Sequence, residues 1–144
     1  MNLSRIAFIP LVLLFTACTT GSTASVAPSS GPTRVEVTLT DALRIEPSVM
    51  TVPAGVPVTI IVSNAGAIDH EFYLGDEAAQ ADHEQEMQSM GGMMHDDANG
   101  IAVDPGETKE LTFTFAEAGD TLAGCHVEGH YTAGMKAAIT VAAR

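Results

Sequence analysis

The chain has 144 residues, of which 46% are hydrophobic, so it is long and apolar enough to form one domain with a buried core and is not a disordered polymer as a whole. It carries 18 acidic against 6 basic side chains, a formal net charge of −12, which argues against nucleic acid as a partner because phosphate binding needs clustered Lys and Arg. Its two cysteines are too few for a disulfide scaffold or a four-thiolate zinc site.

The first cysteine, Cys18, ends an N-terminal segment that is typical of an export signal. A short polar start with one positive charge at Arg5 precedes an apolar run over residues 6–15, which is too short to span a membrane as a helix. The stretch LLFTAC resembles a bacterial lipobox, in which the cysteine becomes the lipidated first residue of the mature protein. Residues 1–18 therefore predict export to the periplasm or cell envelope with a lipid anchor at Cys18; a plain signal peptide cut nearby is the alternative.

The next segment has the composition of a flexible tether. Residues 19–33 consist mainly of Ser, Thr, Gly, Ala and Pro, with hardly any large apolar side chain to bury. The folded domain is therefore expected to span residues 34–144.

The domain has the pattern of short strands separated by Gly- and Pro-containing turns. Residues 34–40 and 107–115 alternate apolar and polar side chains with a period of two, so Leu111, Phe113 and Phe115 are expected to face the core together. Further strands are predicted at residues 49–52, 56–62, 68–74, 121–125 and 136–141. Such a series predicts an all-β, antiparallel β-sandwich and not βαβ units.

One segment, residues 75–100, does not fit the strand pattern and is interpreted as an insertion. It is rich in Asp, Glu, Gln, Ala, Met and His. Residues 76–90 contain good helix formers and an acidic start, which predict a short helix that ends at a hinge formed by Gly91 and Gly92.

The second cysteine lies in the motif C-x4-H-x4-M, formed by Cys125, His130 and Met135 on one predicted loop between two strands. Copper prefers this mixture of thiolate, imidazole and thioether, and two histidines, one cysteine and a weak axial methionine mark a blue-copper site. His70 is the candidate second histidine, because it lies at a strand end that can meet this loop at one pole of a sandwich. Each residue alone has an ordinary structural explanation, but four at this spacing favour a metal site.

From residue 34 to the C-terminus the chain resembles the cupredoxins of the plastocyanin/azurin superfamily. The matching pieces are P-x5-P-x-G at 47–55, N-x5-H-E-F at 64–72, V-x-P-G-E at 103–107, the alternating L-T-F-T-F and the C-x4-H-x4-M loop. The resemblance implies a Greek-key sandwich with one copper ion whose equatorial ligands are His70, Cys125 and His130. It implies Met135 as the axial ligand. His126 is expected to point away from the metal, at the surface or in support of the site, because neighbouring strand residues face opposite sides.

The insertion contains a second set of residues that could bind copper. His83, Met87, Met90 and Met94 have the spacing of one helical face if the helix continues through the glycines, and His95 follows. Thioethers favour Cu(I), and small exported bacterial cupredoxins associated with copper tolerance carry a similar segment. The alternative is that the methionines pack in the core and the acidic residues form a solvated face.

Two functions remain open at this point. The first is copper handling and tolerance in the cell envelope, and the alternative is one-electron transfer to a redox protein partner. An enzymatic role is not expected, because the paired H-x-H motifs of multicopper oxidases are absent from the sequence and a site with four protein ligands leaves no open position for a substrate.

Overall fold

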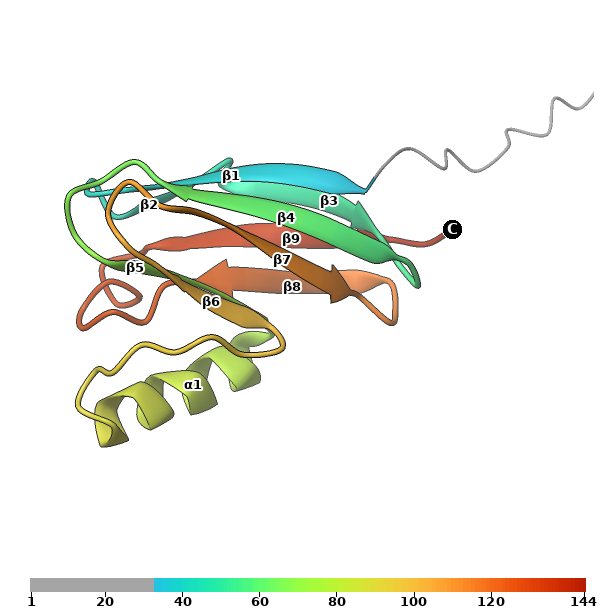
Figure 1. Ribbon diagram of the computed structural model, residues 1–144. Coiled ribbons are helices and arrows are strands. Elements are labelled where there is room, and N and C mark those ends of the chain that lie inside the picture. The colour runs from blue at the N-terminus through green and yellow to red at the C-terminus, as the bar shows by residue number, and fades with distance from the viewer. Residues whose placement is uncertain (1–32) are drawn as a thin grey trace, which may run out of the picture.

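The computed structural model describes residues 33–144, which form two β-sheets packed face to face, with one helix outside them (Figure 1). The strands are β1 (Arg34–Thr40), β2 (Arg44–Glu46), β3 (Val49–Pro53), β4 (Pro57–Asn64), β5 (His70–Gly75), β6 (Gly100–Val103), β7 (Thr108–Thr114), β8 (Gly119–Gly124) and β9 (Lys136–Ala142), and the helix is α1 (Glu77–Ser89). The predicted β-sandwich is confirmed. The predicted export signal and tether cover residues 1–33, of which the structure describes only Thr33.

The two sheets have the strand orders β2-β1-β4-β7 and β3-β9-β8-β5-β6. Antiparallel pairing was expected throughout, but β1 pairs with β4, and β3 pairs with β9, in parallel. Alternation along a strand defines which side chains face the core, but it carries no information on the direction of the neighbouring strand. The sequence pattern therefore could not reveal the two parallel pairs. The short strands β2 and β6 were also missed, and β6 begins at Gly100, the last residue of the predicted insertion.

The hydrophobic core lies between the two sheets. Along β4 every second side chain is buried, and Val58, Ile60 and Val62 are at most 2% exposed. Each large aliphatic side chain buried in this way contributes about 1.5–3 kcal/mol to folding. Leu111 and Phe115 are buried as expected, whereas Phe113 is half-buried and packs against the edge of the core.

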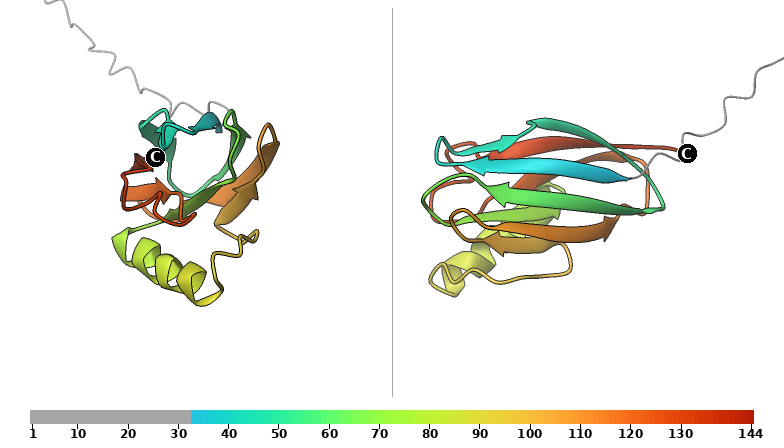
Figure 2. Two further views of the ribbon diagram at one scale, coloured as in Figure 1. Left: turned by 90° about the vertical axis from the view of Figure 1, so that its left-hand side faces the viewer. Right: turned by 45° about the horizontal axis from the view of Figure 1, so that its top comes forward.

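Helix α1 lies on the outer face of the five-stranded sheet, away from the core, as the left view of Figure 2 shows. Its start agrees with the sequence prediction, because Asp76 caps it by accepting a hydrogen bond of 2.9 Å from the N–H of Ala79. Its end also agrees, since Gly91 and Gly92 adopt left-handed backbone angles (φ of 69° and 78°) that stop a helix. Within residues 33–144 no helix combines the length and the apolar character needed to cross a membrane.

Gln80 attaches the helix to the sheet. This buried side chain donates hydrogen bonds to the backbone carbonyls of Tyr73 (3.2 Å), Gly75 (3.2 Å) and Leu122 (3.4 Å). The close approach requires a glycine beneath it, because a Cβ on Gly124 would collide with Oε1 of Gln80 and with the ring of Tyr131. The helix is therefore fixed to the β5–β8 pair.

Substitution of Leu39 tests the placement of the core. Leu39 is 0% exposed, so Leu39→Ala leaves a cavity and is expected to lower the free energy of unfolding by about 2–5 kcal/mol in urea denaturation. The control Val49→Ala changes a side chain that is 65% exposed and is expected to shift stability by no more than about 0.5 kcal/mol. Equal losses in both variants would contradict the assigned core.

Candidate metal centre

Two loops meet at one end of the sandwich, on the left of Figure 1: the β4–β5 loop and the β8–β9 loop. His70 is the first residue of β5, Cys125 follows β8 directly, and His130 lies in the β8–β9 loop. One ligand atom from each of these three residues lies within 4.8 Å of the other two. The tertiary fold thus brings together three of the four residues predicted as ligands, although His70 and Cys125 are 55 positions apart in sequence.

The two imidazoles present the same ring nitrogen to the sulfur. Sγ of Cys125 lies 3.4 Å from Nδ1 of His130 and 3.9 Å from Nδ1 of His70. Met135, the fourth predicted ligand, is fully buried and tied to this group through its backbone. Its N–H donates to the carbonyl of His130 (3.0 Å), and its carbonyl accepts from the N–H of Cys125 (3.2 Å).

The surroundings of Cys125 disfavour a free thiolate. Burial raises the pKa of the Cys125 thiol to about 11, although the N–H of Glu71 donates to Sγ at 3.3 Å. Burial also lowers the pKa of His130, with a further contribution from His70, and this favours the neutral imidazole that binds metals. A bound cation is what would stabilise the thiolate here. Two imidazoles and one cysteine sulfur, with Met135 buried and bonded to the same loop through its backbone, fit a mononuclear copper ion.

Asp41 supports His70 and was not identified from the sequence. Its Oδ1 lies 3.4 Å from Nε2 of His70, the ring nitrogen that is not directed at Cys125. The same carboxylate accepts hydrogen bonds from the N–H groups of Ala67 (2.8 Å to Oδ2) and Ile68 (3.4 Å), and the Ala67 bond is the main reason why the pKa of Asp41 is lowered. The contact to His70 is at ion-pair distance and lacks hydrogen-bond geometry. A carboxylate beside a metal-ligating histidine commonly helps to orient the ring. An acidic residue in a turn is too common a feature to predict this role.

Glu71 is the second supporting residue that the sequence did not reveal. Its carboxylate is buried, accepts the N–H of His126 at 3.1 Å through Oε2, and lies 2.8 Å from Nε2 of His83 through Oε1. It therefore links α1 with the strand that carries His70 and with the residue after Cys125. Within HEF it had the appearance of an ordinary polar strand residue.

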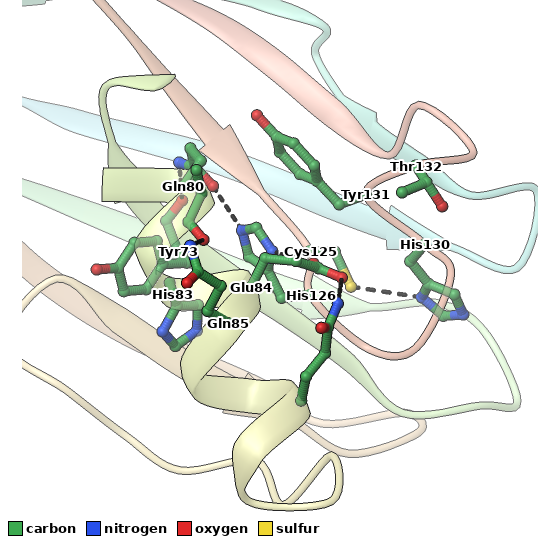
Figure 3. A network of polar contacts seen from close by, with 12 residues as sticks. Tyr73, Gln80, His83, Glu84, Gln85, Cys125, His126, His130, Tyr131 and Thr132 are labelled. Atoms are coloured by element: carbon green, nitrogen blue, oxygen red, sulfur yellow. Dashed lines mark hydrogen bonds and ion pairs between the residues drawn. The ribbon is translucent and has the colours of Figure 1, made fainter. Parts of the chain in front are cut away.

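His126 points away from the Cys125 cluster, as alternation predicts, but it is buried beneath α1 and not at the surface (Figure 3). Its Nδ1 lies 2.7 Å from Oε2 of Glu84, and its Nε2 lies 2.7 Å from Oε1 of Gln80. The ring of Tyr131 stacks on it, with centroids 4.6 Å apart. The helix thus supports the ligand loop from the side opposite the metal centre.

The predicted methionine face of the insertion is interrupted. His83 and Met87 are buried against the sheet, but the helix ends at Ser89 and the chain reverses at the two glycines. Met90 is 38% exposed, and Met94 and His95 are half-buried in the segment that returns to β6. The residues predicted for a second copper site therefore do not share one helical face.

A two-sheet sandwich with cysteine and histidine donors at one pole defines the class of small copper-binding β-sandwich proteins. Residues 7–135 match the family model of the cupredoxin-like domain, and the chain belongs to this family.

The similar proteins include copper-resistant cuproproteins. The chain is 35% identical over 136 residues to the copper-resistant cuproprotein CopI of Pseudomonas aeruginosa. This alignment covers 74% of this chain and 75% of that protein. The chain is 36% identical over 107 residues to CopI of Rubrivivax gelatinosus. That alignment covers 74% of this chain and 65% of the relative, which is slightly less than two thirds of its length.

Among solved structures, reduced auracyanin of Roseiflexus castenholzii superimposes with a TM-score of 0.69 at 26% identity, covering 76% of this chain and 97% of that one. Auracyanin A of Chloroflexus aurantiacus, a "blue" copper protein, gives a TM-score of 0.65 at 30% identity, with 78% and 100% covered.

Removal of the Glu71 carboxylate tests its structural role. Glu71→Ala leaves His83 Nε2 and the N–H of His126 buried without their partner, so we expect the free energy of unfolding to fall by about 1–3 kcal/mol in urea denaturation. Glu117→Ala is the matched control, because Glu117 is exposed, and its effect should stay within about 0.5 kcal/mol. An unchanged unfolding midpoint for Glu71→Ala would show that the buried carboxylate does not stabilise the fold.

Proposed function

We propose that this protein binds one copper ion at the Cys125 centre and acts in copper handling and tolerance in the cell envelope. In this proposal His70, Cys125 and His130 are the strong ligands. Met135 is the weak axial ligand. The observation that carries the proposal is the buried convergence of two imidazole nitrogens and one sulfur within 4.8 Å. The similarity to proteins named copper-resistant cuproproteins supports the role in tolerance.

The chain contributes metal-ligand atoms that are held by the fold and shielded from solvent. Copper, when bound, supplies a single redox-active ion, and the protein residues determine how well it is held. His70 and Cys125 are 0% exposed, so water is excluded from both. Asp41 supports the ring of His70, and the N–H of Glu71 donates to the Cys125 sulfur, a contact of the kind that tunes a copper–thiolate site. Such a centre favours retention of the ion over catalysis, because four protein ligands leave no position for a substrate.

The location in the envelope rests on the N-terminal sequence. Residues 1–18 have the layout of an export signal, and in this proposal Cys18 is the attachment point of a lipid. Residues 19–33 then act as a tether that separates the copper domain from the membrane surface.

Electron transfer is the second candidate function, with a redox protein as partner. It is favoured by the likeness to auracyanin A and by the position of His130, which is 8% exposed in a loop at the pole of the sandwich. The small exposed side chains of Ala65, Ala67 and Ala133 lie on the two loops of this pole, where they would leave room for a partner to approach.

Replacement of the sulfur tests the copper ligands. Cys125→Ser is expected to abolish the intense visible thiolate-to-copper absorption of the copper-loaded protein, because a serine oxygen does not give this transition. The control Thr132→Ala alters an exposed side chain of the same loop and should keep the band. A visible band that persists in Cys125→Ser would overturn the ligand assignment.

The role in tolerance is tested by growth. The test uses a bacterial strain made copper-sensitive by deletion of its own gene for this protein. The wild-type chain and Thr132→Ala should restore growth at raised copper, and Cys125→Ser should not. The three proteins are compared at equal levels in the envelope. Equal rescue by Cys125→Ser would exclude the Cys125 centre as the basis of tolerance. Failure of the wild-type chain to rescue, together with reversible one-electron voltammetry, would favour the carrier function instead.

A further inference from the structure

We propose a second metal site, separate from the Cys125 centre, formed by Nδ1 of His83 with the carboxylates of Glu86 and Asp97. One ligand atom from each of these three residues lies within 4.8 Å of the other two. Imidazole nitrogen with carboxylate oxygen suits a divalent transition-metal ion, and among these Cu(II) binds most tightly to a given nitrogen and oxygen site. The site uses none of the donors of the Cys125 centre.

The unsatisfied nitrogen of His83 is the first observation that points to a ligand. The side chain is 1% exposed, and its Nδ1 has no hydrogen-bond partner among residues 33–144. The nearest charged atom is Oε2 of Glu86, at 3.5 Å. If Nε2 of a neutral His83 donates to Glu71, Nδ1 keeps a free lone pair that is buried with no donor to accept from. Buried polar atoms without a partner are rare in proteins and call for an explanation, and an ion at Nδ1 supplies one.

The opposite nitrogen of the same ring is the second observation. Nε2 of His83 lies 2.8 Å from Oε1 of Glu71, and both side chains are 1% exposed. The ring is also stacked on Tyr73, with centroids 3.8 Å apart and planes within 3° of parallel. A carboxylate on one imidazole nitrogen and a metal on the other is the usual arrangement of metal-binding histidines, since the carboxylate fixes both the tautomer and the orientation of the ring. His83 therefore has the support of a ligand in place.

The carboxylates come from two segments that the chain reversal brings together. Glu86 lies one helical turn after His83 on α1, whereas Asp97 lies beyond Gly91 and Gly92, where its N–H donates to the carbonyl of Gly100 at 2.7 Å. The two side chains are 53% and 42% exposed, so an ion can enter from solvent while Nδ1 of His83 stays buried.

His95 extends the same cluster. Its Nε2 lies 3.0 Å from Oδ2 of Asp97, and its ring centroid lies 5.9 Å from that of His83. The three residues of the cluster thus offer nitrogen and oxygen donors, and Met90 and Met93 are exposed to solvent. This composition favours Cu(II) over the Cu(I) that thioethers prefer.

The test counts copper ions in the intact protein. The protein is first loaded with one equivalent of copper, and Cu(II) is then titrated while bound copper is measured by equilibrium dialysis and its coordination by electron paramagnetic resonance. We expect a second equivalent with nitrogen and oxygen ligands. Glu86→Gln and Asp97→Asn should each weaken its binding by about 10-fold or more, and the double variant should lose it. Both changes are on exposed side chains, so folding, checked by circular dichroism, is expected to be intact.

The control is Asp82→Asn, which removes the same charge from an exposed position on the same helix and should bind the second ion as the wild type does. The proposal is overturned if no second ion binds, or if the double variant binds it unchanged. It is also overturned if Met90→Leu with Met94→Leu abolishes the second ion and the carboxylate variants do not. Because the dependence on Glu86 and Asp97 is measured directly, the result does not rely on the visible band of the Cys125 centre, and the two proposals can fail separately.

Discussion

The pairing of β5 with β8 is the constraint on which the metal centre depends. These neighbouring strands run antiparallel, with Tyr73 opposite Gly124, and the pairing places the start of β5 next to the residues that follow β8. At that end the N–H of Glu71 donates a hydrogen bond to the sulfur of Cys125. A strand pairing that stabilises the sheet thus also positions the first histidine against the cysteine, and the short β8–β9 loop adds His130 and Met135.

The helix is part of the support of this centre, although its sequence has the appearance of a separate acidic appendage. Gln80 bridges the two paired strands from outside, and Glu84 holds the ring of His126 next to the cysteine. The buried carboxylate of Glu71 completes the connection, because it contacts both His83 on the helix and the backbone of the ligand loop. Glu71 therefore contacts both candidate metal clusters, His83 through its carboxylate and the sulfur of Cys125 through its backbone N–H.

Local sequence patterns were enough to predict the class of fold and to select the candidate donors of the Cys125 centre, of which the structure brings His70, Cys125 and His130 together. Period-two alternation marks the core face of strands such as β4 and β7, because successive side chains of a strand face opposite sides. The C-x4-H-x4-M motif could be interpreted because Cys125, His130 and Met135 lie within one short loop, where spacing in sequence translates into proximity in space. The start and end of the helix could also be predicted from nearby residues, because Asp76 caps the start and Gly91 and Gly92 stop the helix.

The direction of strand pairing and the partners of the buried polar residues depend on contacts between distant segments, so they became apparent in the folded structure alone. Asp41 meets the loop before His70 across 26 positions, and Glu71 meets the residue after Cys125 across 55. Such contacts leave no periodic trace, because a carboxylate has the same appearance in a sequence whether it faces water or a buried histidine. The Met/His segment illustrates the limit: helical spacing predicted one face of thioethers, but the glycine reversal brings carboxylates and imidazoles together instead.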